Sequence, residues 1–239
     1  MDHGNTIPTW TCAEVSQKDD EQQHKVVSAQ GLNYRKGYMQ ESEIEQTLPR
    51  AMRTMRLGKH ALLHFVIWLG ALATFAAADS WSTVTGLTFA ALLAILAAVV
   101  TGITSTTIIH EWFHFLGAWV SGGRYGIPKN KGLFVYDWHY SENSVKQFYI
   151  MSIAGTVGSV AGIALLWSAV PTDTAARAAL TAAAIASLAY GACVEWPVLR
   201  RTQRSGDPLA ELSKIDSRVL TRSFAVAIAV GAMAWWALT

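Results

Sequence analysis

The apolar residues of this chain gather into long runs that begin near residue 60. A membrane-spanning helix needs about 20 largely apolar residues. Five segments approach or exceed this length, and each is predicted to span a membrane as a helix: residues 61–78, 83–120, 147–170, 178–199 and 224–238. The pattern therefore predicts an all-α polytopic membrane protein with about five transmembrane helices.

Two of these runs differ in length from a simple span. Residues 83–120 would form a helix of roughly 57 Å, whereas the hydrocarbon layer is about 30 Å thick. This segment is expected to tilt strongly, to break near Thr101 and Gly102, or to project beyond the bilayer. The run 224–238 is short, so the charged group of Arg222 is expected to extend to the membrane surface.

The segment between the second and third spans differs from the spans in its residue composition. Residues 122–126 (Gly-Gly-Arg-Tyr-Gly) are typical of a turn, and residues 133–136 (Leu-Phe-Val-Tyr) are typical of a strand. We therefore predict a small β-hairpin at the membrane surface between these two spans.

Lysine and arginine residues indicate which loops face the cytoplasm. They concentrate before the first span, between the second and third spans, and between the fourth and fifth spans. A five-span chain with a cytoplasmic N-terminus satisfies this pattern, which suits a bacterial cytoplasmic membrane. Residues 1–59, which are polar and mixed in charge, are then predicted to be a cytoplasmic tail, and residues 60–239 the transmembrane domain.

Composition narrows the class of protein further. Charged residues make up 15% of the chain and apolar residues 51%, against about 25% charged residues in an ordinary soluble domain. The net charge of +2 is too small for a phosphate-binding surface, which excludes a nucleic-acid partner and leaves the lipid bilayer. The pattern indicates no particular oligomeric state.

Reactive side chains occur inside the second apolar run, where His110-Glu111-Trp112-Phe113-His114 forms an H-E-x-x-H motif. Positions i and i+4 of a helix share one face, so both imidazoles are placed to bind one Zn²⁺ ion. The glutamate between them is placed to act as a general base toward a water molecule at the metal. Ionisable residues inside a membrane span are typically functional, which favours a metal site over two packed histidines.

A zinc site of this kind needs a third protein ligand. Glu195 is the charged group of the fourth span and lies five residues before Arg200, roughly 7 Å inside the cytoplasmic edge. Asp207, in the segment that follows, is the alternative ligand. We favour Glu195 because a charge inside an apolar run needs more explanation than an Asp-Pro turn. Asp137 and His139 are weaker candidates in the loop after the second span.

The third span carries small residues at helical spacing: Gly155, Gly158, Ser159 and Gly162. Such a face allows a neighbouring helix to approach closely. We expect that neighbour to be the helix that carries His110.

Together these features resemble the site-2 protease family of intramembrane zinc metalloproteases, over about residues 85–210. The resemblance implies that His110 and His114 bind zinc and that Glu111 is the catalytic base. The third ligand of that family is an aspartate, usually in an Asp-Gly motif, which this chain lacks; Glu195 or Asp207 must take its place. The family's Gly-Pro-x-x-Asn motif is also incomplete, so the chain would be a divergent, minimal member.

The predicted function is an intramembrane zinc metalloprotease that hydrolyses peptide bonds of membrane-embedded or membrane-proximal substrates. The missing Asp-Gly motif leaves an alternative open, namely a non-catalytic membrane scaffold or assembly partner that retains a degenerate metalloprotease fold. An iron-dependent lipid-modifying enzyme is disfavoured, because such enzymes use several histidine boxes and His110 and His114 form the single intramembrane pair.

Overall fold

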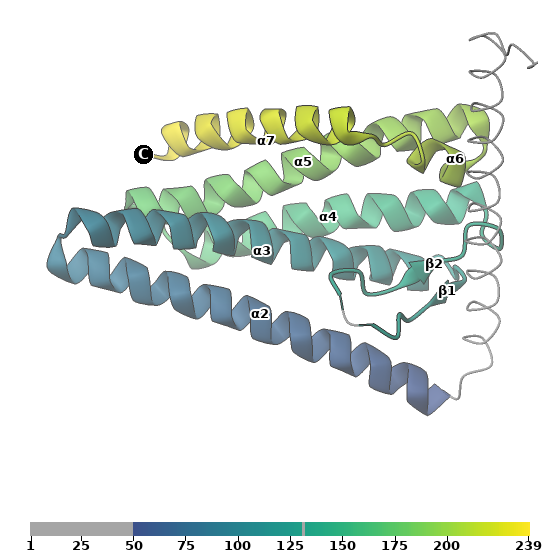
Figure 1. Cartoon of the computed structure of the whole chain (residues 1–239), viewed down its shortest axis with the longest axis horizontal. Coiled ribbons are helices and arrows are strands. Elements are labelled where there is room, and N and C mark those ends of the chain that lie inside the picture. The colour runs from purple at the N-terminus through teal and green to yellow at the C-terminus, as the bar shows by residue number, and fades with distance from the viewer. Residues whose placement is uncertain (1–49, 131) are drawn as a thin grey trace, which may run out of the picture. The chain divides into compact units, whose positions relative to one another are not determined.

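The computed structural model describes residues 50–130 and 132–239; most of the predicted tail, residues 1–49, lies outside them. Within these ranges, five helices are long and apolar enough to cross a membrane: α2 (Arg50–Thr85), α3 (Thr88–Val120), α4 (Val145–Ala169), α5 (Ala175–Ser205) and α7 (Ser217–Leu238). A short helix, α6 (Pro208–Leu212), connects α5 to α7 (Figure 1). The chain is therefore a multi-pass membrane protein of the all-α class, as predicted.

The first two spanning helices differ in extent from the apolar runs that predicted them. Helix α2 begins at Arg50, so residues 50–59 form its first turns. It ends at a turn in which Gly86 has a φ of 66°, a backbone conformation that glycine adopts without steric penalty. Helix α3 then runs unbroken through Thr101 and Gly102. At 1.5 Å per residue its 33 residues extend roughly 50 Å, so the excess length is accommodated without a break.

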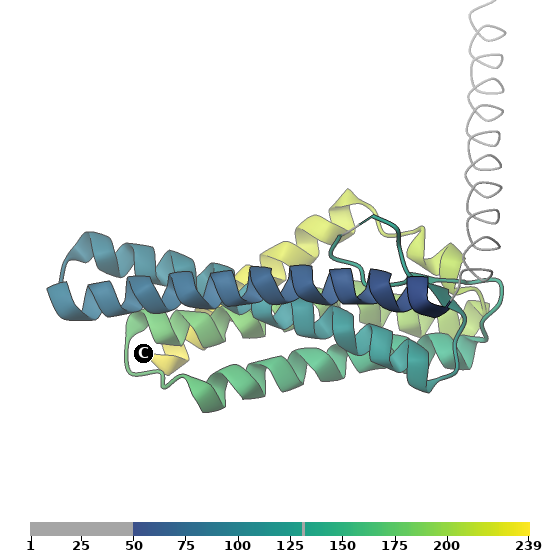
Figure 2. The ribbon, with the colours of Figure 1, turned by 90° about the horizontal axis from the view of Figure 1, so that it is seen from below.

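Helices α3, α4 and α5 pack against one another and form the centre of the bundle. Helix α2 packs against α3, and α7 packs against α5, so these two helices lie at the edges (Figure 1). Seen from below, α4 lies to one side of the layer made by the other spanning helices (Figure 2). The residues with candidate chemistry are therefore on the helices that have the most neighbours.

The glycines of α4 explain how closely α3 and α4 approach. A methyl group added at Gly158 would overlap Phe113, and one added at Gly162 would contact Ile109. Both neighbours belong to α3, so the small-residue face of the third span packs against the helix that carries His110, as predicted.

A two-stranded antiparallel sheet lies between α3 and α4, formed by β1 (Tyr125–Gly126) and β2 (Asp137–Trp138). This confirms the predicted hairpin, but the strand expected over residues 133–136 is wrong. Those residues form a loop in which Leu133 and Phe134 are exposed and Val135 is buried. The physical reason lies in the preceding loop. Its main-chain carbonyls at Pro128 and Gly132 accept hydrogen bonds from side chains of α2, and not from a partner strand.

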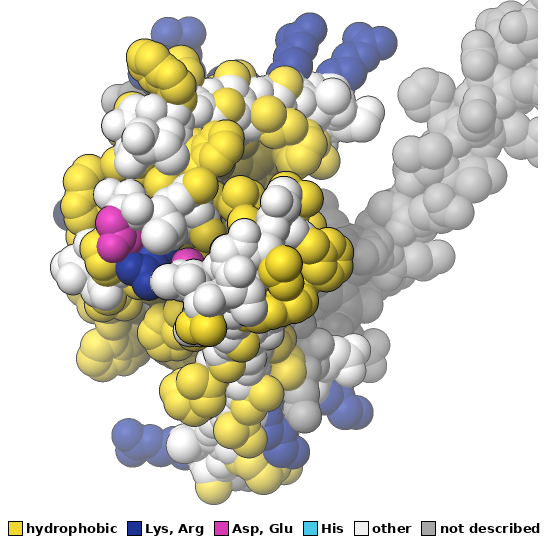
Figure 3. Space-filling view, turned by 90° about the vertical axis from the view of Figure 1, so that its left-hand side faces the viewer, with side chains coloured by type: hydrophobic (Ala, Val, Ile, Leu, Met, Phe, Trp, Pro, Cys, Tyr) yellow, Lys and Arg dark blue, Asp and Glu magenta, His cyan; other side chains and the backbone are white. Residues whose placement is uncertain are grey.

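Charge is distributed unequally between the two ends of the bundle. Most of the described arginines and lysines lie at the end that carries the sheet and α6, including Arg53, Arg124 and Arg201. The opposite end, shown in Figure 3, has a small group of charged side chains within a largely hydrophobic surface. There Arg177 of α5 bonds Asp79 of α2 at 2.8 Å and Asp173 at 2.9 Å, an ion pair that ties α2 to α5.

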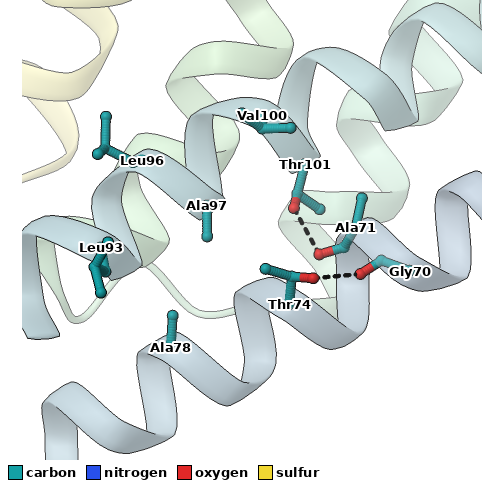
Figure 4. Close-up of a pocket in the computed structure, with 9 residues that line it drawn as sticks. All are labelled: Gly70, Ala71, Thr74, Ala78, Leu93, Leu96, Ala97, Val100 and Thr101. Atoms are coloured by element: carbon teal, nitrogen blue, oxygen red, sulfur yellow. Dashed lines mark hydrogen bonds between the residues drawn. The ribbon is translucent and has the colours of Figure 1, made fainter.

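A groove of about 420 Å³ separates α2 from α3 near the middle of the bundle (Figure 4). Its two threonines offer no free donor, because Thr101 donates to Ala71 O and Thr74 donates to Gly70 O. The other lining residues are glycine, alanine, leucine and valine. Thr101 also lies nine residues before His110, roughly 13 Å along α3. The groove therefore holds no candidate chemistry and lies away from the histidines.

Candidate metal centre

Three side chains from two helices converge at one point of the bundle. His110 and His114 of α3 face each other, with their Nε2 atoms 2.8 Å apart. Oε1 of Glu195, on α5, lies 2.8 Å from Nε2 of His110 and 3.3 Å from Nε2 of His114. Within the described residues these are the one His, Cys, Asp and Glu group placed to hold a metal ion. The structure thus brings together the three residues predicted to be ligands.

The other ring nitrogens of the two histidines are bonded to α4. Nδ1 of His114 lies 2.8 Å from Met151 O, and a carbonyl only accepts hydrogen bonds, so this nitrogen carries the proton. In the neutral ring, Nε2 of His114 then presents a lone pair to the centre. Nδ1 of His110 lies 2.9 Å from Oγ of Ser159. Such partners fix the orientation of metal-binding imidazoles.

The donor set fits a divalent metal ion. Two imidazole nitrogens and a carboxylate oxygen face one another, and a cation would relieve the repulsion between their lone pairs and charge. The second carboxylate oxygen of Glu195, Oε2, is buried and has no hydrogen-bond partner among the described residues. A buried carboxylate oxygen without a partner is unfavourable unless an ion or another group satisfies it. Two His and one Glu form a donor set that is common in catalytic zinc sites.

Glu111 lies beside this group. It is 8% exposed and is close enough to His110, His114 and Glu195 to interact with them electrostatically. Its carboxylate makes no hydrogen bond to any residue in the described ranges, in contrast to Glu195. Glu111 therefore remains available to accept a proton from a molecule in the site.

The other candidates from the sequence lie elsewhere. Asp207 caps α6 by accepting a hydrogen bond from the backbone N–H of Ala210 at 3.0 Å. His139 is buried and lies 3.3 Å from Glu142. Asp137 is part of β2. The structure brings none of the three into the group formed by the histidines and Glu195.

Side chains of α2 hold the loop that follows β1. Each donates to a main-chain carbonyl: Arg53 to Tyr125, Arg56 to Ile127, His60 to Pro128 and His64 to Gly132, at 3.3, 3.2, 3.2 and 2.9 Å. His64 also accepts a hydrogen bond from the indole N–H of Trp112 at 3.0 Å, so its Nε2 carries the proton donated to Gly132. The loop is thereby linked to the helix turn that carries the motif.

We expect His64→Phe to loosen this loop without displacing the metal ligands. The substitution leaves the Gly132 carbonyl and the Trp112 indole without their partner, and one lost hydrogen bond is worth about 1 kcal/mol. Amide hydrogen exchange over residues 127–136 should become about 5- to 10-fold faster. Thr74→Val is the matched control, because it removes a hydrogen bond within α2 alone. Equal exchange in all three proteins would show that other contacts hold the loop.

Tyr136, at the end of this loop, is a residue that the sequence pattern did not identify as a candidate. Its ring packs against Phe115 and Tyr125, with ring centroids 6.3 and 6.2 Å apart. Burial, together with the negative charges of Glu111 and Glu195, raises the pKa of Tyr136 above its ordinary value. The hydroxyl is therefore influenced by both carboxylates and stays protonated. The sequence held a weak signal for it, a tyrosine at the end of the apolar stretch 133–136.

Comparison with known proteins gives no match: no family model, curated protein or solved structure is similar to this chain. The resemblance to site-2 proteases therefore stays a prediction.

Proposed function

We propose that this protein is an intramembrane zinc metalloprotease. The observation that carries the proposal is the convergence of His110 Nε2, His114 Nε2 and Glu195 Oε1, with Glu111 beside them and without a hydrogen-bond partner in the described ranges. The two histidines and Glu195 would supply the metal ligands, and Glu111 would supply the general base that hydrolysis needs.

His110, His114 and Glu195 would hold the zinc ion, and the ion would act as a Lewis acid toward the substrate carbonyl. Ser159 and Met151 bond the Nδ1 atoms of the two imidazoles, so both Nε2 atoms would face the metal with the rings already oriented. Three protein ligands leave a coordination position for water or substrate, which distinguishes a catalytic site from a structural one.

Glu111 would take a proton from the attacking water and deliver it to the leaving amine when the peptide bond breaks. Its burial on α3 keeps it in a region with little water, where a hydrolytic reaction depends on the few molecules that enter. The imidazoles and Glu195 are occupied as ligands, so Glu111 is the proton acceptor in this arrangement.

The position of the site supports a substrate in or near the membrane. All four residues lie on helices that are long and apolar enough to span a bilayer. They lie toward the end of the bundle that is rich in lysine and arginine, the end that faces the cytoplasm by the positive-inside rule. This supports a cytoplasmic N-terminus and a cut near the cytoplasmic side, as in a bacterial cytoplasmic membrane.

The test combines metal analysis with a cleavage assay. Full-length protein in detergent should contain about one zinc ion per chain and should cut members of a mixture of fluorescent single-span peptides. Glu111→Gln should keep the zinc and lose at least about 100-fold in cleavage rate, since a positioned general base contributes roughly 10²- to 10⁴-fold. Glu142→Gln is the control for removing a carboxylate outside the site.

Three results would contradict the proposal. If the folded wild-type protein contained no bound metal, a zinc-dependent reaction would be excluded. Zinc-loaded protein whose cleavage does not depend on Glu111 would indicate a contaminating protease. Zinc binding with no cleavage of any peptide would favour the scaffold or assembly-partner alternative.

A further inference from the structure

Two sets of contacts hold Tyr136 against α3. One is the aromatic packing against Phe115, the residue directly after His114, and against Tyr125 of β1. The other is the set of hydrogen bonds from side chains of α2 to the preceding loop, the last of which runs from His64 to the Gly132 carbonyl. Phe115 follows Glu111 by about one turn of α3, so the Tyr136 ring is held on the face of α3 that carries Glu111.

The hydroxyl of Tyr136 has no hydrogen-bond role among the described residues. It forms no hydrogen bond to any residue in the ranges 50–130 and 132–239, although the carboxylates of Glu111 and Glu195 are near enough to affect it. It is a neutral donor, because burial and those carboxylates keep it protonated. A neutral donor beside a metal centre is suited to an oxygen that becomes negative during the reaction.

The other loop tyrosine, Tyr140, does not share this placement. Its ring packs against Phe148 of α4, with centroids 6.3 Å apart. Burial raises the pKa of Tyr140 to about 12, without a contribution from the carboxylates of the site. Tyr140 is thus largely covered, as Tyr136 is, but its ring packs on α4 and not on Phe115 of α3.

We propose that the Tyr136 hydroxyl donates a hydrogen bond to the carbonyl oxygen of the bound substrate, on which negative charge develops as water attacks. This inference rests on the proposed protease function. Tyr136 is then a catalytic residue that complements Glu111: Glu111 accepts the proton of water, and Tyr136 stabilises the oxygen that gains charge. Removal of one such donor lowers kcat by roughly 10²- to 10³-fold in other enzymes.

The test compares Tyr136→Phe with Tyr140→Phe in zinc-loaded, full-length protein. The probe is a phosphinic tetrapeptide with apolar side chains, whose tetrahedral anionic group resembles the reacting centre. Its affinity, measured by calorimetry in detergent, should fall about 10- to 100-fold in Tyr136→Phe and stay unchanged in Tyr140→Phe. Zinc content should be unchanged in both variants. In the peptide cleavage assay, Tyr136→Phe should lower kcat on the order of 100-fold with little change in KM.

Other outcomes distinguish failure of the proposed role of Tyr136 from failure of the protease proposal. Equal probe affinity in wild type and Tyr136→Phe overturns the role of Tyr136 and leaves the protease proposal standing. Loss of zinc from Tyr136→Phe also overturns it, because the hydroxyl would then support the metal site instead of the substrate. Absence of both probe binding and cleavage in zinc-loaded wild type overturns the protease proposal, and this inference with it.

Discussion

Glu195→Ala is expected to abolish stable zinc binding, whereas Asp207→Ala should bind zinc as the wild type does. Glu195 supplies the oxygen that lies 2.8 Å from Nε2 of His110, and no second carboxylate takes part in the described group. Changes to residues that only orient metal ligands reduce metal affinity by about 10- to 100-fold. Loss of a ligand should exceed that range. Zinc content after gel filtration, together with a titration against a chelator, measures the difference.

Asp207→Ala is a demanding control because it also removes a carboxylate near the same end of the bundle. Its expected effect is limited to the cap of α6, since a lost N-cap costs about 1 kcal/mol of helix stability. Zinc loss in Asp207→Ala with retention in Glu195→Ala would reverse our assignment of the third ligand. Retention in both variants would show that the two histidines bind zinc without either acid.

The sequence predicted the histidine pair and the acid for different reasons. The spacing of His110 and His114 is local, and the 3.6-residue period of a helix is sufficient to place them on one face. Glu195 lies 85 residues beyond His110. Glu195 could be predicted only from two arguments. An unpaired charge in an apolar span is unfavourable, and the predicted topology places Glu195 in the same half of the membrane as the histidines.

The contacts that orient the histidines had no comparable signal. Ser159 was expected to provide a small surface for helix packing, and the structure also places its hydroxyl 2.9 Å from Nδ1 of His110. The partner of His114 is a backbone carbonyl, which any residue at position 151 would supply. Sequence reasoning predicts the approach of α4 but not which atom meets which ring nitrogen.

The loop between α3 and α4 shows the limit of local patterns most clearly. Residues 133–136 have the composition of a strand, but strand formation also needs a partner for the backbone. Side chains of His60 and His64, about 70 residues earlier in the chain, take the carbonyls of Pro128 and Gly132. No spacing rule connects those positions, so neither the loop nor the placement of Tyr136 beside the site was predictable.

Gly155 has a role in the site that follows from its lack of a side chain. A Cβ at this position would overlap the imidazole of His114, whose ring atoms fill the space above the glycine. The ring is also bonded to Met151 one turn earlier on α4, so it cannot move away without breaking that hydrogen bond. Gly191 of α5 faces His110 in a similar way but at 3.7 Å, an ordinary contact distance.

Gly155→Ala is therefore expected to weaken zinc binding by at least 10- to 100-fold and to lower the free energy of unfolding by about 1–3 kcal/mol, because the ring of His114 must turn or α3 and α4 must separate. Gly191→Ala should change neither quantity measurably, since its added methyl group has room. A chelator titration of both variants in detergent measures zinc affinity, and loss of helical circular dichroism on heating measures stability. Wild-type zinc affinity in Gly155→Ala would show that the bundle accommodates the methyl group without moving His114. Reduced affinity in Gly155→Ala alone would make the close approach of α4 to His114 a requirement of the metal site.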